Sequence, residues 1–100
     1  MAVAYLIVEM HVTDPERYKA YMAAAPAAVK AAGGEYLVRG GRSETLEGDR
    51  QPHRVAMLRF PSFEQAKAFY DGEYKNVRKL RQGTTEYFNM VLVEGVAAPV

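Results

Sequence analysis

Three polar side chains in this sequence have the chemical types and the surroundings to bind or transform a small molecule. Arg39 stands beside the glycine pair Gly40–Gly41, and a guanidinium next to flexible backbone N–H groups can hold a carboxylate or an enolate. Glu9 and His11 lie close together in an apolar segment, where a carboxylate or an imidazole could move a proton. The hypothesis is that Arg39 holds an anionic group while Glu9 or His11 handles a proton.

Four further side chains would shape the same pocket. Arg59 and Asn89 are polar residues within apolar segments, and Tyr5 and Tyr36 can donate hydrogen bonds from largely apolar rings. Each candidate also has a structural explanation. Arg39 could simply form an ion pair, the polar strand residues could form a hydrogen-bonded layer at an interface, and the tyrosines could pack there.

The composition excludes several kinds of chemistry. The chain has no cysteine, which excludes disulfides and thiolate metal sites and fits a cytoplasmic protein. Its two histidines, His11 and His53, lie in different segments without metal-ligand spacing to carboxylates. The glycine pair Gly33–Gly34 precedes an apolar segment, whereas a phosphate-binding loop would follow a strand. We therefore predict no metal and no organic cofactor.

Length and charge predict one domain without a charged partner. One hundred residues suffice for one core, which we place in residues 1–95, with residues 96–100 as a C-terminal tail. The formal net charge of +1 gives no electrostatic case for binding nucleic acid or an anionic membrane. The apolar segment at the N-terminus is too short to span a bilayer and lacks the features of a signal peptide.

The candidate residues must be positioned by alternating strands and amphipathic helices. Apolar alternation predicts strands over residues 2–12, 35–39, 54–60 and 87–94, and a resumed strand over 43–47 before a turn at 48–52. A first helix begins at Thr13 or Asp14 and ends at Gly33. A second begins at Ser62, breaks at Gly72 and continues to residue 81, with Tyr70 and Leu80 on its buried side.

The order β-α-β-β-α-β predicts a ferredoxin-like α+β fold. Right-handed connections then give one four-stranded antiparallel sheet with both helices on one face. The other face would carry an apolar patch, which on a small protein indicates an interface. Its residues are Tyr5, Ile7, Val55, Met57, Val91 and Val93. The simplest solution is a two-fold homodimer whose sheets pack face to face.

A spaced set of residues resembles a known family. The set comprises Gly33-Gly34-x-Tyr36-Leu37-Val38-Arg39-Gly40-Gly41, Leu46-Glu47-Gly48, Arg54-Val55, Phe60-Pro61-Ser62, Ala66, Phe69-Tyr70, Glu73-Tyr74 and Arg81. The chain is similar to the domain of unknown function 1330 family over nearly its whole length. The resemblance implies a dimeric α+β barrel, a superfamily that includes small cofactor-independent monooxygenases, haem-degrading enzymes and muconolactone isomerases. It implies fold and assembly, because the family has no settled activity.

Three functions fit these observations. The chain could be a cofactor-independent enzyme, monooxygenase- or isomerase-like, that acts on a small polar or aromatic acid inside each half of a dimer. It could be a metabolite-binding dimer without turnover, or a purely structural or partner-binding subunit. A cavity would separate the first two from the third, and a general base beside the ligand would separate the enzyme from the binding protein.

Overall fold

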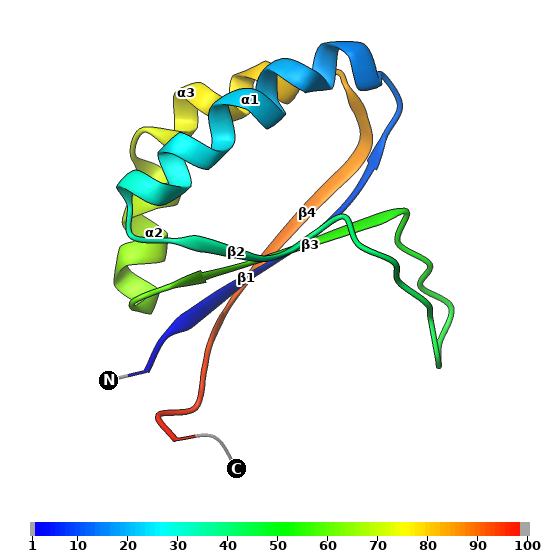
Figure 1. Ribbon diagram of the computed structural model, residues 1–100. Helices are drawn as coiled ribbons and strands as arrows, with labels where there is room; N and C mark the ends of the chain where they lie inside the picture. The colour runs from blue at the N-terminus through cyan, green and yellow to red at the C-terminus, as the bar shows by residue number, and fades with distance from the viewer. Residues whose placement is uncertain (1, 99–100) are drawn as a thin grey trace.

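The computed structural model describes residues 2–98 and has the predicted ferredoxin-like fold (Figure 1). Residues 99–100 of the predicted tail lie outside the described residues. The elements are β1 (Ala4–Val12), α1 (Pro15–Ala31), β2 (Glu35–Arg39), β3 (Arg54–Phe60), α2 (Phe63–Asp71), α3 (Tyr74–Arg78), a 3₁₀ turn η1 (Lys79–Arg81) and β4 (Thr85–Glu94). The strands pair antiparallel in the order β2-β3-β1-β4.

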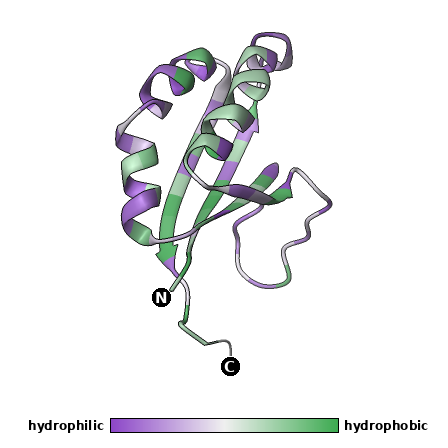
Figure 2. Cartoon of the chain, turned by 60° about the vertical axis from the view of Figure 1, so that its left-hand side comes forward, coloured by the Kyte–Doolittle hydropathy of each residue, from purple (hydrophilic) through white to green (hydrophobic). Residues whose placement is uncertain are grey.

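All the helices lie on one face of the sheet, as Figure 1 shows. The strands are the most hydrophobic part of the chain (Figure 2). Alternate residues of the two central strands face the helices and form the core with α1 and α2; among them, Val8 is 2% exposed and Phe60 is 0% exposed. The opposite face is uncovered in the single chain, where Val91 is 56% exposed.

The ends of α1 place β2 beneath the helices. Asp14 caps the N-terminus by accepting a hydrogen bond from a backbone N–H one turn later, the second of the two predicted starts. At the other end, Gly33 has φ of 80°, and its N–H donates to the Lys30 carbonyl. The Gly34 N–H donates to the Val29 carbonyl at 2.9 Å. This pair of bonds is a Schellman motif, and it turns the chain directly into the edge strand.

A bulge in β2 determines which way its side chains point. Tyr36 pairs with Leu58 and Arg39 with Ala56, and the register shifts at Leu37 between them. Both partners belong to the buried, helix-facing side of β3. If the same residues paired without a bulge, strict alternation would put Tyr36 and Arg39, three positions apart, on opposite faces.

The segment from residue 41 to residue 53 is an exposed loop, so the predicted resumption of the strand over 43–47 is wrong. Gly40 has φ of 73°, which bends the chain away from the sheet edge. The only large apolar side chain in the predicted extension is Leu46, which is 85% exposed. Without a face to bury, the extension gains nothing by pairing with β3.

The second helical region is more broken than its spacing predicts. Tyr70 is 37% exposed and Leu80 is 42% exposed, whereas both were expected in the core. Gly72 ends α2, and the chain resumes in the short α3 before tightening into η1. Each break changes the helical phase, so the 3.6-residue spacing does not carry across. Tyr74 remains the central buried residue of this region, at 1% exposure.

Candidate functional site

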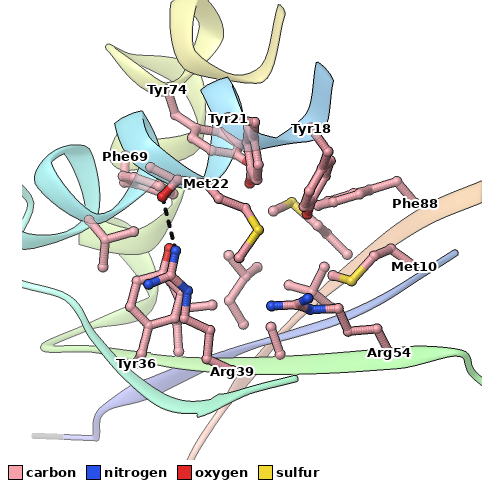
Figure 3. A pocket seen from close by; sticks show the side chains of 17 residues that line it. Met10, Tyr18, Tyr21, Met22, Tyr36, Arg39, Arg54, Phe69, Tyr74 and Phe88 are labelled. Atoms are coloured by element: carbon pink, nitrogen blue, oxygen red, sulfur yellow. Dashed lines mark hydrogen bonds between the residues drawn. The ribbon is translucent and has the colours of Figure 1, made fainter. Parts of the chain in front are cut away.

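A cavity of about 40 Å³ lies between α1 and the sheet (Figure 3). Its sheet side comes from helix-facing residues of all four strands. Its helix side carries Tyr18, Tyr21 and Met22 of α1, with Tyr74 of α3 behind them. The lining is mostly apolar, and its charged members are two arginines. The cavity therefore combines a hydrophobic body with a few polar groups, as ligand pockets usually do.

The two arginines enter the cavity from neighbouring strands. Arg39 donates from Nη2 to the Met22 carbonyl at 3.0 Å, and its guanidinium lies 4.8 Å from the Tyr36 ring centre (Figure 3). Arg54 packs against Gly40 so closely that a Cβ there would lie 2.7 Å from the guanidinium. Within residues 2–98, neither arginine forms an ion pair with a carboxylate. Two uncompensated cations at one cavity favour an anionic ligand.

The tyrosines around the cavity are hydrogen-bond donors at neutral pH. Burial raises the pKa of Tyr18, against the opposing charges of Arg54 and Arg81. Burial also raises the pKa of Tyr36, and burial with the neighbouring Tyr74 raises that of Tyr21 most strongly. The hydroxyls of Tyr21 and Tyr74 share a hydrogen bond inside the core. Because their pKa values are raised, Tyr18, Tyr21 and Tyr36 keep their protons at neutral pH and are poor bases.

The predicted acid–base and binding residues are divided between the two faces of the sheet. Tyr36 and Arg39 lie on the helix face, at the cavity. Tyr5, Glu9, Arg59 and Asn89 lie on the open face, where Tyr5 pairs with Arg59 and Glu9 with Asn89 in the strand register. The sequence hypothesis grouped all of them around one ligand, and the structure does not bring them together.

The open-face charges are already paired within the chain. Arg50, from the loop after β2, donates through Nη2 to both oxygens of Glu9, at 2.6 and 2.8 Å. Arg59 donates to Glu35 of β2. This arrangement is the hydrogen-bonded polar layer that we considered as the structural explanation for these residues. Of the residues described, no Asp, Glu or His lines the cavity itself.

His11 has a neighbour that the sequence did not indicate. Its ring stacks on that of His53, with centroids 3.6 Å apart and an interplanar angle of 6°. The Nδ1 atom of His11 lies 3.5 Å from a carboxylate oxygen of Glu86. Both imidazoles line a surface hollow together with Tyr18 and Arg54, which also line the cavity. The histidine pair is therefore close to one side of the cavity wall.

Several site residues were missed by reading the sequence. Arg54, Ala56 and Leu58 are spaced by two residues, so strand alternation places Arg54 on the same, helix-facing side as the other two. This spacing was a usable signal in the sequence. Tyr18, Tyr21 and Tyr74 are buried, and the hydroxyl pair of Tyr21 and Tyr74 joins residues far apart in the chain, so no local pattern indicates it. The described part of the chain contains no cluster of three or more His, Cys, Asp or Glu residues that could hold a metal ion.

The fold and the family agree with the sequence resemblance. This is a ferredoxin-like α+β protein with an arginine-lined cavity between helix and sheet. The chain belongs to the family described as domain of unknown function (DUF1330), which it matches over residues 3–96. No curated protein matches the sequence. None of the described helices is long and apolar enough to cross a membrane.

Solved structures share this fold at low sequence identity. A protein of unknown function from Rhodopseudomonas palustris has a TM-score of 0.77 and 16% identity, over 97% of this chain and 85% of its own. A Nitrosomonas europaea protein, provisionally assigned as an antibiotic biosynthesis monooxygenase, has a TM-score of 0.58 and 17% identity, over 95% and 91%. At these identities the likeness establishes the fold alone.

Proposed function

We propose that this protein binds a small organic carboxylate in the cavity between α1 and the sheet. The observation that carries the proposal is the pair Arg39 and Arg54, two cavity-lining guanidiniums without a carboxylate partner among the described residues. A bound carboxylate would accept hydrogen bonds from both. The protonated hydroxyls of Tyr18 and Tyr36 line the same cavity. This arrangement gives a mostly buried anion the donors that it needs.

The size of the cavity selects between the two kinds of acid that the sequence left open. A volume of about 40 Å³ has room for about three water molecules, or for a ligand close to acetate in size. An aromatic acid would require Met22 or Arg54 to move. The small polar acid is therefore the ligand class that the cavity favours.

Binding is tested by titrating acetate into protein labelled with ¹³C at the methionine methyl groups. Met10 and Met22 line the cavity, and Met57 lies on the other face of the sheet. We expect acetate to shift the Met10 and Met22 signals and to leave Met57 unchanged. Acetamide, which has nearly the same shape without the charge, should bind about 10- to 100-fold more weakly, because hydrogen bonds to a charged group are the stronger ones.

The matched variants replace an arginine inside the cavity and one outside it. Arg39→Met and Arg54→Met should each weaken acetate binding by about 10- to 100-fold. Arg42→Met, in the exposed loop, should leave binding unchanged. Equal effects of Arg39→Met and Arg42→Met, or equal binding of acetate and acetamide, would overturn the proposal.

A second candidate function is proton-transfer catalysis, carried by the His11–His53 pair. Both rings line the hollow that contains Tyr18 and Arg54 of the cavity. A carboxylate ligand with an adjacent carbonyl, held by Arg54, would present an acidic C–H toward this side. An imidazole would remove that proton and form an enolate, which the guanidinium stabilises. This keeps His11 in its predicted role, whereas Glu9 is occupied by Arg50.

The catalytic candidate is tested with pyruvate in D₂O. Exchange of the pyruvate methyl protons for deuterium removes their NMR signal, and the protein should accelerate this loss. His11→Gln and His53→Gln should slow the exchange without weakening acetate binding. A wild-type rate no faster than that of buffer would contradict catalysis of this kind and leave the binding function standing.

We also propose that a second copy of the chain covers the open face of the sheet. The support is the apolar set of the open face, in which Val91 and Val93 are exposed and Ile7 and Met57 are half-buried. Face-to-face packing of two such sheets would bury it. Light scattering should give the mass of a dimer at micromolar concentration, and Val91→Asp with Val93→Lys should give a monomer. A wild-type monomer would contradict the proposal.

A further inference from the structure

A second chamber, of about 260 Å³, adjoins the first and carries its own unsatisfied cation. Its apolar wall includes Leu6, Met90 and Leu92, and its polar side carries Lys67, Tyr70 and Arg81. The chamber shares Leu6, Phe88 and Met90 with the first cavity, so these residues separate the two spaces. It is several times larger than the cavity at Arg39.

Arg81 has a buried hydrogen-bond donor without an acceptor. Its guanidinium lies 3.6 Å above the centre of the Phe88 ring, which fixes its plane. Within the described residues, its Nε–H is buried and unpaired, and the residue forms no ion pair. A buried N–H without a partner destabilises a protein, so such a group is expected to meet an acceptor during function.

The neighbouring charges do not neutralise this site. Lys67 lies 3.7 Å from Asp71, but both side chains of that pair are more than half exposed and screened by solvent. Arg78 stacks on the ring of Tyr70, with its guanidinium 4.3 Å from the ring centre, and its Nη1 is buried without an acceptor. Arg78 does not line the chamber itself, but it adds positive charge beside Tyr70, which does. The polar side of the chamber is therefore positive, and the Phe88 ring holds the guanidinium of Arg81 in position.

We propose that the second chamber is a separate binding site for an organic anion with an apolar body, such as an aryl or alkyl carboxylate. The carboxylate would accept hydrogen bonds from Arg81, in the fork geometry that suits a guanidinium. The body would lie along Leu6, Met90 and Leu92. The larger volume accepts the ring-sized body that the cavity at Arg39 excludes. This inference rests on the unpaired donors and does not depend on acetate binding at the first site.

The test is a titration with phenylacetate, followed through ¹³C-labelled methyl groups of methionine and leucine. Of these two spaces, Leu92 lines only the second chamber and Met22 lines only the first cavity, and Met57 lies on the open face. We expect saturable shifts at Leu92 and none at Met57. Arg81→Met should weaken binding by about 10- to 100-fold, and Arg39→Met should change it by less than about twofold.

The wild-type protein supplies a second measurement that needs no folded variant. The neutral analogue 2-phenylethanol should bind about 10- to 100-fold more weakly than phenylacetate. Equal binding of the two compounds, or an undiminished Leu92 shift in Arg81→Met, would overturn the second site. Shifts at Met22 that disappear in Arg39→Met, with Leu92 unmoved, would also overturn it while leaving the first site intact. If acetate does not shift the Met22 signal while phenylacetate gives a saturable shift at Leu92, only the first site is overturned.

Discussion

The two faces of the sheet hold their charges in opposite ways. On the open face, Glu9 and Arg59 each meet a partner of opposite charge from a neighbouring element. On the helix face, Arg39 and Arg54 line a cavity. Arg39 meets the Tyr36 ring and the Met22 carbonyl, and neither arginine meets a carboxylate in the described chain. Glu9 and Arg59 on the open face are thus balanced by partners of opposite charge, whereas the helix face carries two positive charges without such partners.

This difference indicates where a ligand is needed. Paired surface charges contribute little and require nothing further. On the helix face Arg54 is half-buried and Arg39 is exposed at the edge of the cavity, so two neighbouring positive charges lack a counter-charge that a bound anion would supply. The residues most attractive on chemical type alone, Glu9 and His11, therefore point less clearly to a ligand than the arginines on the other side.

The largest expected difference between the faces is in packing. Phe60→Ala on the helix face, where the ring is 0% exposed, should lower the free energy of unfolding by about 3 to 5 kcal/mol. Val91→Ala on the open face should change it by less than about 0.5 kcal/mol at protein concentrations low enough to populate the single chain. Urea denaturation measures both. Similar losses would mean that the open face is packed even without a partner.

High pH should weaken the helix face selectively. Tyr21 has a pKa raised above its ordinary value of 10.0 by burial, so above pH 10 the unfolded chain loses this proton while the folded chain keeps it. Folding stability should then fall with pH, by up to about 1.4 kcal/mol per pH unit for each such tyrosine. Tyr18 and Tyr36 should add to the slope.

The variant Tyr21→Phe isolates the contribution of one residue to this slope. It should be less stable at neutral pH, because the Tyr74 hydroxyl loses its partner, but its stability should fall less steeply between pH 10 and 11. Urea midpoints measured across this range give the slope directly. An unchanged slope would mean that Tyr21 does not keep its proton in the folded state.

Two glycines with positive φ separate backbone strain from the positioning of Arg54. A Cβ at Gly40 would collide with the Arg54 guanidinium, whereas nothing lies within 4 Å of a Cβ at Gly48. Gly40→Ala and Gly48→Ala should each cost about 1 to 2 kcal/mol of stability, since both residues adopt the left-handed region. Only Gly40→Ala should also weaken acetate binding, which the methionine spectra would detect.

The smallest expected effect belongs to the open-face ion pair. Arg50→Gln removes the partner of Glu9, but the arginine side chain is 68% exposed, so stability should change by about 0 to 1 kcal/mol. The change should shrink further at high salt. Acetate binding should be unaffected. A clear loss of binding would place Glu9 in the site after all and remove the contrast between the faces.

The element order and the fold were predictable from the sequence because their signals are local. Asp14 and Ser62 mark helix starts by capping the first turn, and Gly33 ends a helix through its positive φ. Alternation identified the strands and the bare apolar face. The resumed strand at 43–47 was wrong because alternation without a face to bury does not stabilise a strand.

The site was only partly predictable because it depends on contacts between distant segments. Arg39 was predicted to be an anion contact from its type and its glycine neighbours, and it lines the cavity. Arg39 and Glu9 lie on opposite faces of the sheet because of the bulge at Leu37, and no residue type in β2 indicates that bulge. The Tyr21–Tyr74 hydroxyl pair and the Gly40–Arg54 contact likewise arise only when the elements pack.

The bulge in β2 also bears on how this site could change during evolution. One additional residue at Leu37 sets the parity of everything that follows it in the strand. Pairing the same residues in strict alternation would turn the guanidinium of Arg39 from the helix side of the sheet to the open side. Deleting the extra residue would instead leave Tyr36 and Arg39 two positions apart, and therefore on the same face. Descendants that are one residue shorter at this point should keep the inner cation, whereas descendants that lose the bulge at constant length should lose it.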